Sequence, residues 1–557
     1  MLVGIDVGGT FTDGVLLAGG EIVSSAKHPT DEARLQETIL AVLDELIKGV
    51  EAASIERVVL STTLVTNLLA TGRGEETALL LIPGPGLNLH RMELVPNTYI
   101  VDGAIDFRGR MTKPLNNAEV EEAGEKIAAQ GIRKVAVVGK FSQRNNRHEL
   151  QAGEILKKKH PGFDIVLGHQ VSGQLNFLRR AVTTYYTAMT QDRWQRFARE
   201  VEKAITERGV DAPVEILKAD GGTMLLPVSE RYPCETVFSG PAASAMGAFA
   251  LTMDQQTSVI VDIGGTTSDL AFILEGKPLY ASKGAVIGGK YTHVRSFAVR
   301  SIALGGDSTV RWNGEKVTVG PDRQGVAACF GGPGPTPTDA FNLLGNGPLG
   351  GVEYSRAALA RVAGEAGLSP EALAGAVVEQ VVDQLTWNIK DMFKSWEQEP
   401  AYKVWEIVNK RKVTLDRVIG IGAAAGAFIP ALASRLNCGS LVHKYSPVAN
   451  ALGACVARPT LSLVLHADTQ QGTYALNQDG ITGSISNRLQ MEDVKKLARE
   501  HLVRMAHERG MGKYADQCEY FLEEQFNVIR SWSTVGRLFD VGIQIAPGVI
   551  EEFKGVK

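Results

Sequence analysis

The strongest constraint on the fold of this chain is a short motif that occurs twice, far apart in the sequence. Residues 6–13 read Asp-Val-Gly-Gly-Thr-Phe-Thr-Asp, and residues 262–269 read Asp-Ile-Gly-Gly-Thr-Thr-Ser-Asp, with five of eight positions identical. Each copy lies between two apolar runs, which predicts a strand, a tight turn and a second strand. Two copies indicate two related half-molecules and not a solenoid, which would need more repeats.

The motif has a clear chemical use. The strand delivers an aspartate to its end, and the two glycines bend the chain so that backbone N–H groups can face phosphate oxygens. Mg²⁺ prefers a few carboxylates and keeps several waters. A glycine turn capped by aspartate is the alternative for either copy alone, but two copies with the same spacing favour a grip on a polyphosphate. The predicted catalytic carboxylates are Asp6, Asp13, Asp262 and Asp269, with Asp6 and Asp262 as metal ligands. The predicted phosphate-binding residues are Gly8, Gly9, Thr10, Thr12, Gly264, Gly265, Thr266 and Thr267.

The rest of the chain alternates between strand and helix patterns, which is typical of α/β organisation. We predict an N-terminal half over residues 1–255 with an inserted α/β segment, a second half over 256–458, and a small unit over 459–557. The glycine- and proline-rich residues 320–352 predict a long loop, followed by helices for which Ser355 and Ser369 are the expected N-caps.

The paired hairpins resemble the phosphate loops of the actin/heat-shock chaperone/sugar-kinase ATPase superfamily. Within it, residues 4–13 are similar to the start of the hydantoinase A/5-oxoprolinase/acetone carboxylase β family. Further segments agree in order, and the resemblance covers roughly residues 1–456: Ser61-Thr62-Thr63-Leu64-Val65-Thr66-Asn67, Asp220-Gly221-Gly222, Ser239-Gly240-Pro241-Ala242-Ala243 and Thr336-Pro337-Thr338-Asp339-Ala340. The chain departs from the family at Thr267-Ser268, at Gly305-Gly306-Asp307-Ser308 and over residues 325–330.

The resemblance implies an α/β fold of two related actin-like (ribonuclease H-like) halves, with mixed sheets flanked by helices, plus a small C-terminal α+β unit. It implies ATP and Mg²⁺ as cofactors, bound between the halves. It also predicts an adenosine loop, which residues 419–427 fit through Gly422 and Gly426. Read alone, that segment is a loose dinucleotide fingerprint or a packed strand–helix corner.

The function implied is an ATP-dependent hydrolase of the hydantoinase/oxoprolinase kind, which phosphorylates an oxygen of a cyclic amide or of a carboxylate. Thr63 and Asn67 are the candidate substrate contacts. Family members often work with a second, B-type subunit, so a separate partner is implied. The departures leave two alternatives open, namely an ATP-switched accessory protein and a small-metabolite kinase.

The composition of the chain argues against several other classes of protein. Lys plus Arg number 58 and Asp plus Glu 62, so no overall basic field favours nucleic acid. The five cysteines show no CxxC spacing, which disfavours a zinc ribbon or a disulfide framework. No apolar run reaches the ~20 residues of a membrane span, and no signal peptide is evident. We therefore expect a cytoplasmic protein, and large cytosolic enzymes often form symmetric homo-oligomers.

Overall fold

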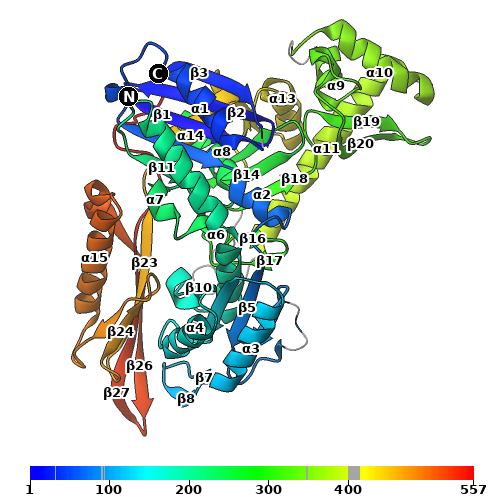
Figure 1. The fold of residues 1–557 in the computed structure, drawn as a ribbon. Coiled ribbons are helices and arrows are strands. Elements are labelled where there is room, and N and C mark those ends of the chain that lie inside the picture. The colour runs from blue at the N-terminus through cyan, green and yellow to red at the C-terminus, as the bar shows by residue number, and fades with distance from the viewer. Residues whose placement is uncertain (32, 90–91, 93, 346–348, 399–413, 557) are drawn as a thin grey trace.

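The computed structural model describes residues 1–557 except 32, 90–91, 93, 346–348, 399–413 and 557. Two larger mixed sheets form the upper part of the molecule, and two smaller units hang below them (Figure 1). Helices flank the sheets, so the fold is the mixed α/β arrangement expected from the sequence. In the described part of the chain, no helix is long and apolar enough to cross a membrane.

The first sheet has the order β12-β11-β4-β1-β2-β3. β1 pairs antiparallel with β2 and parallel with β4, which pairs parallel with β11. Helices α1 (Leu35–Leu46) and α6 (Phe177–Thr206) pack on one face, where Val58, Leu60 and Ile216 are buried. The strands are β1 (Leu2–Val7), β2 (Phe11–Ala18), β3 (Glu21–Pro29), β4 (Arg57–Thr62), β11 (Val214–Leu217) and β12 (Thr223–Leu225).

The second sheet repeats this plan. Its order is β15-β14-β13-β21-β22, with β18 also paired to β14. β13 pairs antiparallel with β14 and parallel with β21, which pairs parallel with β22. The shared plan of an antiparallel hairpin followed by two parallel neighbours agrees with the two related halves predicted from the repeated motif. The strands are β13 (Ser258–Ile263), β14 (Ser268–Leu274), β15 (Lys277–Pro278), β18 (Val299–Ile302), β21 (Arg417–Ile421) and β22 (Gly439–Val442).

Helices cover the outer face of this second sheet and extend beyond it. An apolar cluster there includes Phe272, Phe341 and Phe428. The helices are α9 (Pro337–Leu343), α10 (Val352–Ala366), α11 (Pro370–Glu397) and α13 (Ala425–Leu436), beside the hairpin of β19 (Ser308–Trp312) and β20 (Val317–Arg323).

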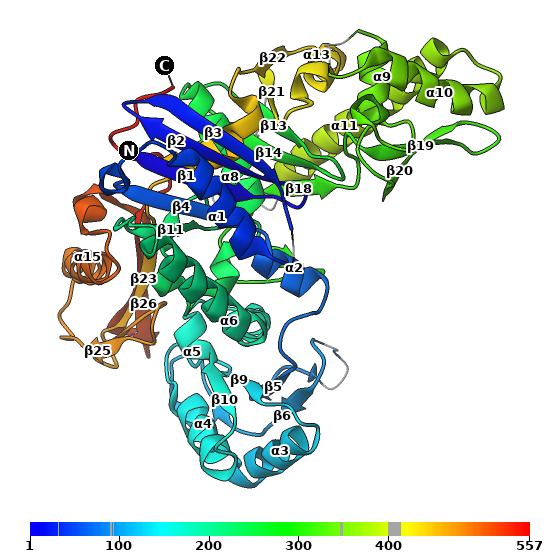
Figure 2. The same ribbon diagram turned by 45° about the horizontal axis from the view of Figure 1, so that its top comes forward.

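Two small-residue helices, α8 (Ser239–Thr252) and α14 (Ala449–Val456), lie between the sheets (both are labelled in Figure 1, and α8 also in Figure 2). A Cβ added to Gly247 would lie 2.1 Å from the carbonyl oxygen of Ala449, and one added to Gly453 would lie 2.4 Å from the nitrogen of Gly247. The two helix backbones therefore touch, and only glycine fits at the contact.

The unit inserted into the first half contains a parallel sheet of order β10-β9-β5-β6. Helices α3 (Asn117–Ala129) and α4 (Arg147–Lys159) pack on it through Val120, Ile127 and Leu156. Its remaining elements are β5 (Thr77–Ile82), β6 (Thr98–Ile100), β7 (Ala104–Ile105), β8 (Met111–Lys113), β9 (Lys134–Gly139) and β10 (Asp164–Leu167). Short helices join this region to the first half, namely α2 (Leu64–Ala70) before β5 and α5 (Gly168–Val171) after β10, and a third short helix, α7 (Leu226–Ser229), follows β12.

The C-terminal unit is an antiparallel sheet with one helix. The order is β25-β24-β23-β27-β26, and α15 (Met491–Glu508) buries Val494, Leu502 and Met505 against it. This helix matches the amphipathic pattern of the sequence. The strands are β23 (Leu461–Asp468), β24 (Thr473–Leu476), β25 (Thr482–Ser484), β26 (Cys518–Arg530) and β27 (Ser533–Ile545).

Two local predictions were wrong. Ser355 is not an N-cap: α10 already begins at Val352, and the buried Ser355 hydroxyl donates to Asp339. The span 320–352 is not all loop, because α9 begins inside it with a capping box between Thr336 and Asp339. Ser369 does cap α11, since its side chain accepts the N–H of Ala372.

Candidate functional site

The two repeated motifs form hairpins with the same geometry. The N–H of Gly8 donates to the carbonyl oxygen of Phe11 at 3.0 Å, and the N–H of Gly264 donates to that of Thr267 at 3.0 Å. The registers also correspond, since Asp6 lies opposite Asp13 and Asp262 opposite Asp269. Each hairpin therefore presents two facing carboxylates beside a glycine turn.

Asp6 is the most buried of these acids, with 3% of its surface exposed. Burial raises its pKa to about 7, with help from the charges of Asp13 and Asp262 and against hydrogen bonding from Ser61 and Asn450. Its Oδ1 is buried with no hydrogen-bond partner among the described residues, and the same holds for Oδ1 of Asn450. Two unpaired buried oxygens fit a cation or its water shell.

The other residues of the first hairpin differ in whether they are already hydrogen-bonded or remain available to a ligand. Asp13 accepts a hydrogen bond from Nζ of Lys27 at 2.6 Å, while burial raises the pKa of this carboxyl. Thr12 is fully buried, and its hydroxyl lies 3.0 Å from that of Thr30. Gly9 is exposed, and a Cβ there would meet nothing within 4 Å. The glycine turn is therefore open for a ligand, whereas the Thr12 hydroxyl is already engaged.

In the second hairpin, Oδ2 of Asp262 accepts hydrogen bonds from Ser244 at 2.5 Å and from Nδ2 of Asn450 at 3.0 Å. Burial raises the pKa of Asp269 to about 7, Asp262 adds to the rise, and a hydrogen bond from Ser301 opposes it. Ser244 lies on α8 and Asn450 on α14. The central helices therefore hold the carboxylate of the second half in place.

The tip of the second hairpin, Gly264 to Thr267, rests on residues 305–307. The N–H of Gly306 donates to Gly264 at 2.9 Å and that of Asp307 to Gly265 at 2.8 Å. Asp307 lies in one of the segments at which the sequence departs from the family that it resembles, and its carboxylate pairs with Arg323 at 2.9 Å. Gly264, Thr266 and Thr267 remain exposed. The departure at Asp307 thus adds an ion pair behind the turn.

The predicted adenosine loop lies against this hairpin. Gly422 has φ +94°, and a Cβ there would lie 2.6 Å from the carbonyl oxygen of Ile263 and 3.4 Å from Oδ1 of Asp262. Gly426 lies in the first turn of α13 with open space where a side chain would be. Two glycines of this segment therefore border the second acidic hairpin.

Thr63 and Asn67 lie on the first half, where β4 passes into α2. Nδ2 of Asn67 is 3.5 Å from the Thr63 hydroxyl, at the limit of a hydrogen bond. Ser61 of β4 pairs with Asp6 of β1. Thr63 and Asn67 follow Ser61 along the chain, so they lie near the same ends of these parallel strands as Asp6.

Lys27, Ser244 and Asn450 were not singled out from the sequence. Lys27 lies opposite Asp13 on β3, a strand that the polar residues 21–29 did not predict. Ser244 directly follows a segment used for the family resemblance. Asn450 is a polar residue within a run of Ala and Gly, and that contrast was the available signal.

The candidate site is acidic, with four aspartates and one lysine. Within the described ranges, no three His, Cys, Asp or Glu side chains come close enough to form a protein-only metal site. Mg²⁺ suits such a place, because it binds through one or two carboxylates together with substrate phosphates.

Two halves with the same sheet plan, joined by touching helices and each carrying an acidic glycine hairpin, define the class of protein. The chain belongs to the hydantoinase/oxoprolinase family: the family model Hydantoinase/oxoprolinase matches residues 180–462, and that of the Hydantoinase/oxoprolinase N-terminal region matches residues 2–160.

Individual relatives support the same conclusion. The chain is 24% identical to caprolactamase subunit alpha of Pseudomonas jessenii, over 94% of this chain and 78% of that one. It is 27% identical to the acetophenone carboxylase gamma subunit of Aromatoleum aromaticum, over 61% of this chain and 52% of that one. The chain thus spans only about half the length of several curated relatives. The nucleotide-free acetone carboxylase structure has the same fold, with a TM-score of 0.71 at 17% identity over 99% of this chain and 88% of that one.

Proposed function

We propose that this chain binds Mg-ATP between its two hairpins and uses it to activate a cyclic amide, of the hydantoin or 5-oxoproline kind, or a carboxylate. The observation that carries the proposal is the correspondence of the hairpins, with matched turn bonds and matched pairs of aspartates, together with the effect of the Asp13 and Asp262 charges on Asp6. ATP-dependent relatives with this fold add support, since acetone carboxylation is described as ATP-dependent.

Each group of the site has a role in this proposal. Asp6 and Asp262 hold the metal, and the orphaned Oδ1 of Asp6 is a ready ligand. Backbone N–H groups and hydroxyls of the two turns bind phosphate oxygens, with Gly8, Gly9, Thr10, Gly264, Gly265, Thr266 and Thr267 as the candidates. Thr12 is the weakest candidate, because its hydroxyl contacts Thr30. Gly422 and Gly426 form the surface for the adenosine.

Bound ATP supplies a phosphoryl group, which turns an amide or carboxylate oxygen into a good leaving group. The residues position the reactants and balance charge, as is general for phosphoryl transfer. With a pKa near 7, Asp269 can take up a proton at neutral pH, which suits a general base. Asp13 is held by Lys27 and orients water, and Thr63 and Asn67 contact the substrate.

We also propose a separate B-type partner subunit, because the caprolactamase and acetophenone carboxylase relatives are named as subunits. A second candidate function is an ATP-switched accessory protein. The direct contact of α8 with α14 favours it, since such a contact suits closure of one half on the other.

The test is a calorimetric titration of Mg-ATP into the wild type and into Asp262→Asn. Binding that requires Mg²⁺ and weakens at least about tenfold in the variant supports the proposal. Asp322→Asn is the control, since Asp322 is exposed and pairs with Arg311, which belongs to neither hairpin. Equal affinity in the wild type and in Asp262→Asn would contradict it.

A second assay separates the candidate activities. ADP release stimulated by a lactam, with a ring-opened product in mass spectrometry, identifies the amidohydrolase. A stable phosphorylated product identifies a metabolite kinase. Partner binding that depends on ATP, without turnover of any small molecule, identifies the accessory protein.

A further inference from the structure

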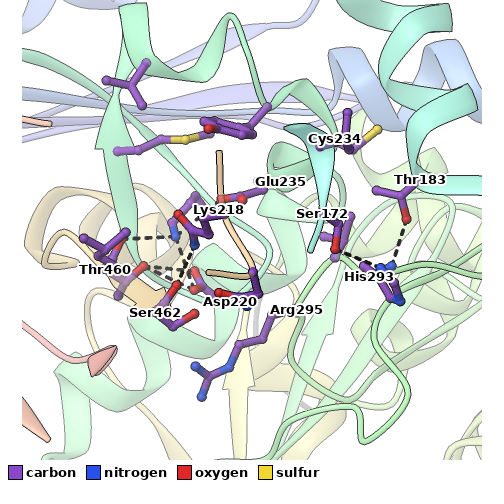
Figure 3. Close-up of a pocket in the computed structure, with 18 of the residues that line it drawn as sticks. Ser172, Thr183, Lys218, Asp220, Cys234, Glu235, His293, Arg295, Thr460 and Ser462 are labelled. Carbon is purple, nitrogen blue, oxygen red and sulfur yellow. Dashed lines mark hydrogen bonds and ion pairs between the residues drawn. The ribbon is translucent and has the colours of Figure 1, made fainter. Parts of the chain in front are cut away.

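A second cavity lies away from the hairpins, where several parts of the chain meet. It is lined by the end of β11, by the start of α6, by residues 293–295 and by the C-terminal unit, and its volume is about 100 Å³. One water needs about 10–15 Å³ on this measure, so the space holds a molecule of several heavy atoms. The close-up shows two groups of polar side chains on opposite sides of it: Lys218, Asp220 and Thr460 on one side, and Ser172, Thr183 and His293 on the other (Figure 3).

This cavity is separate from the proposed nucleotide site. Ile216 faces α6 in the first core, and Lys218 follows it by two residues, so both belong to the α6 face of the sheet. Asp6 accepts hydrogen bonds from the side chains of Ser61 and Asn450. Asn450 lies on α14, which packs on the other face of the first sheet. The sheet therefore stands between the two places.

Arg295, one of the cations that line the cavity, has no ion-pair partner among the described residues. The lining has three cations, Lys218, Arg295 and Arg509, and two carboxylates, Glu235 and the buried Asp220. Arg509 pairs with Asp479 at 2.8 Å. Burial opposes the charge of Asp220, but Lys218, Arg295 and the N–H of Gly222 lower the pKa of this carboxyl, so it is ionised at neutral pH. Glu235 is more distant from Lys218, at 3.6 Å, with 41% of its side chain exposed. Because Arg295 contacts only neutral groups among the described residues, Gln544 and Tyr280, it can take a further negative charge.

The cations also have unused hydrogen-bonding capacity. The contacts of Lys218 Nζ are all long, at 3.3 Å to the carbonyl oxygen of Thr460 and 3.4 Å to Asp220. Arg295 donates from one Nη to Gln544 at 2.6 Å and stacks over the ring of Tyr280. No other hydrogen bond joins the Arg295 side chain to a described residue. Both side chains can therefore donate to an oxyanion.

Two neutral groups of the lining have unpaired atoms as well. His293 is neutral at physiological pH, because burial and the charge of Arg180 lower its pKa to about 3. Its Nδ1 is 2.9 Å from the Ser172 hydroxyl, and its Nε2 is buried without a well-formed hydrogen bond to a described residue, although the backbone of Leu175 is near enough to oppose the fall in pKa. Oε1 of Gln478 is likewise buried and unpaired. A ligand with a hydroxyl or N–H group beside its charge would satisfy these atoms.

We propose that this cavity binds a small hydroxy- or amino-substituted carboxylate, whose oxygens accept hydrogen bonds from Lys218 and Arg295 and whose second polar group pairs with His293 Nε2 and Gln478 Oε1. The ligand contacts Lys218 of the first half, His293 and Arg295 of the second half, and Gln478 of the C-terminal unit together. Its binding therefore stabilises the junction of these three parts.

The test uses three probes of nearly equal size: L-lactate, propionate and L-lactamide. They separate the contribution of the charge from that of the hydroxyl group. Ligand-observed NMR titration of the full chain, with thermal denaturation alongside, measures binding. We expect lactate to bind best, propionate more weakly and lactamide at least about tenfold more weakly than lactate.

Variants assign the binding to the cavity. Arg295→Met lowers lactate affinity at least about tenfold, Arg295→Lys restores part of it, and His293→Phe removes the advantage of lactate over propionate. Arg199→Met is the matched control, because Arg199 is an exposed arginine that pairs with Glu230 outside the cavity. Mg-ATP titration of the same variants checks their folding and the proposed nucleotide site independently. Equal binding of lactate and lactamide, unchanged affinity in folded Arg295→Met, or no binding of any probe would each overturn the proposal.

Discussion

Asn450 donates its side-chain amide to Asp262 at 3.0 Å, and it does so from the helix that also borders Asp6. One side chain of α14 thus serves the carboxylates of both halves. Its side-chain oxygen Oδ1 has no hydrogen-bond partner among the described residues, and the same is true of Oδ1 of Asp6. The position of the two acids is therefore set by a residue that belongs to neither repeated motif.

The first prediction concerns this amide. Asn450→Leu leaves Asp262 without one of its two donors in a partly buried place, which costs about 1–3 kcal/mol of folding free energy at pH 8. Urea denaturation measures the cost. Mg-ATP affinity falls as well, because a donor that lowers the pKa of Asp6 is lost. An Asn450→Leu protein as stable as the wild type, with unchanged affinity, would show that the amide has no such role.

The second prediction uses the raised pKa of Asp6. Its ordinary value is 3.8 and its folded value is about 7, so the folded protein binds the extra proton between these values, and stability rises as the pH falls from 7 towards 4. Without metal, Asp6→Asn therefore stabilises the protein by about 2–4 kcal/mol at pH 8 and by almost nothing near pH 4. Denaturation across this pH range in EDTA checks the slope. A gain that does not depend on pH would contradict the assignment.

The third prediction concerns metal loading. Since Asp6 must be ionised to hold Mg²⁺, the affinity for Mg-ATP decreases as the pH falls below about 7, by up to about tenfold per pH unit. Calorimetry between pH 5.5 and 8.5 measures this dependence. Asp6→Asn lacks it, and it also binds more weakly at pH 8.

The fourth prediction concerns the touching helices. Gly453→Ala places a methyl group 2.2 Å from the carbonyl oxygen of Ala243, which forces α8 and α14 apart and destabilises the protein by about 1–3 kcal/mol or more. Gly375→Ala is the matched control on α11, where a Cβ meets nothing within 4 Å, and it stabilises by about 0.5–1 kcal/mol. Thermal denaturation of the pair compares the two effects. Equal melting temperatures would contradict the close contact.

The fifth prediction concerns Arg57, which is buried beside Glu215 at 2.6 Å. Its guanidinium also donates to the carbonyl oxygens of Cys455 and Ala457, so it ties the first sheet to the chain that leaves α14. Arg57→Met leaves Glu215 buried and uncompensated, which costs about 3–5 kcal/mol. Arg199→Met removes an exposed pair and costs about 0–1 kcal/mol. Comparable losses in the two variants would refute this account.

The repeated motif was enough to predict the two halves and the matched hairpins. A carboxylate before two glycines and another after them constrains the backbone locally, and two copies imply two such places. Ser369 was predictable as a cap for the same reason, since its hydroxyl reaches the N–H of the third residue along the chain.

The features that the sequence did not predict depend on contacts between distant segments. Strand β3 is mostly polar because one side of it faces solvent, and its pairing with β2 is what brings Lys27 to Asp13. The sequence predicts Ser355 as a helix cap. In the structure it lies inside α10, where its hydroxyl donates a hydrogen bond to Asp339. The cavity beside Lys218 forms where four segments of the chain meet. No one of these segments has a sequence pattern that predicts the cavity.

Gly247 and Gly453 bring the two halves together with no side chain between their backbones at that point. A layer of side chains can slide, but interlocked main chains resist translation and leave turning as the easier displacement. The crossing of α8 and α14 is therefore the point about which one half would turn relative to the other. Asp262 is attached close to it through Ser244, so a small rotation at the crossing moves the exposed tips of the hairpins through a wider arc than it moves the carboxylates.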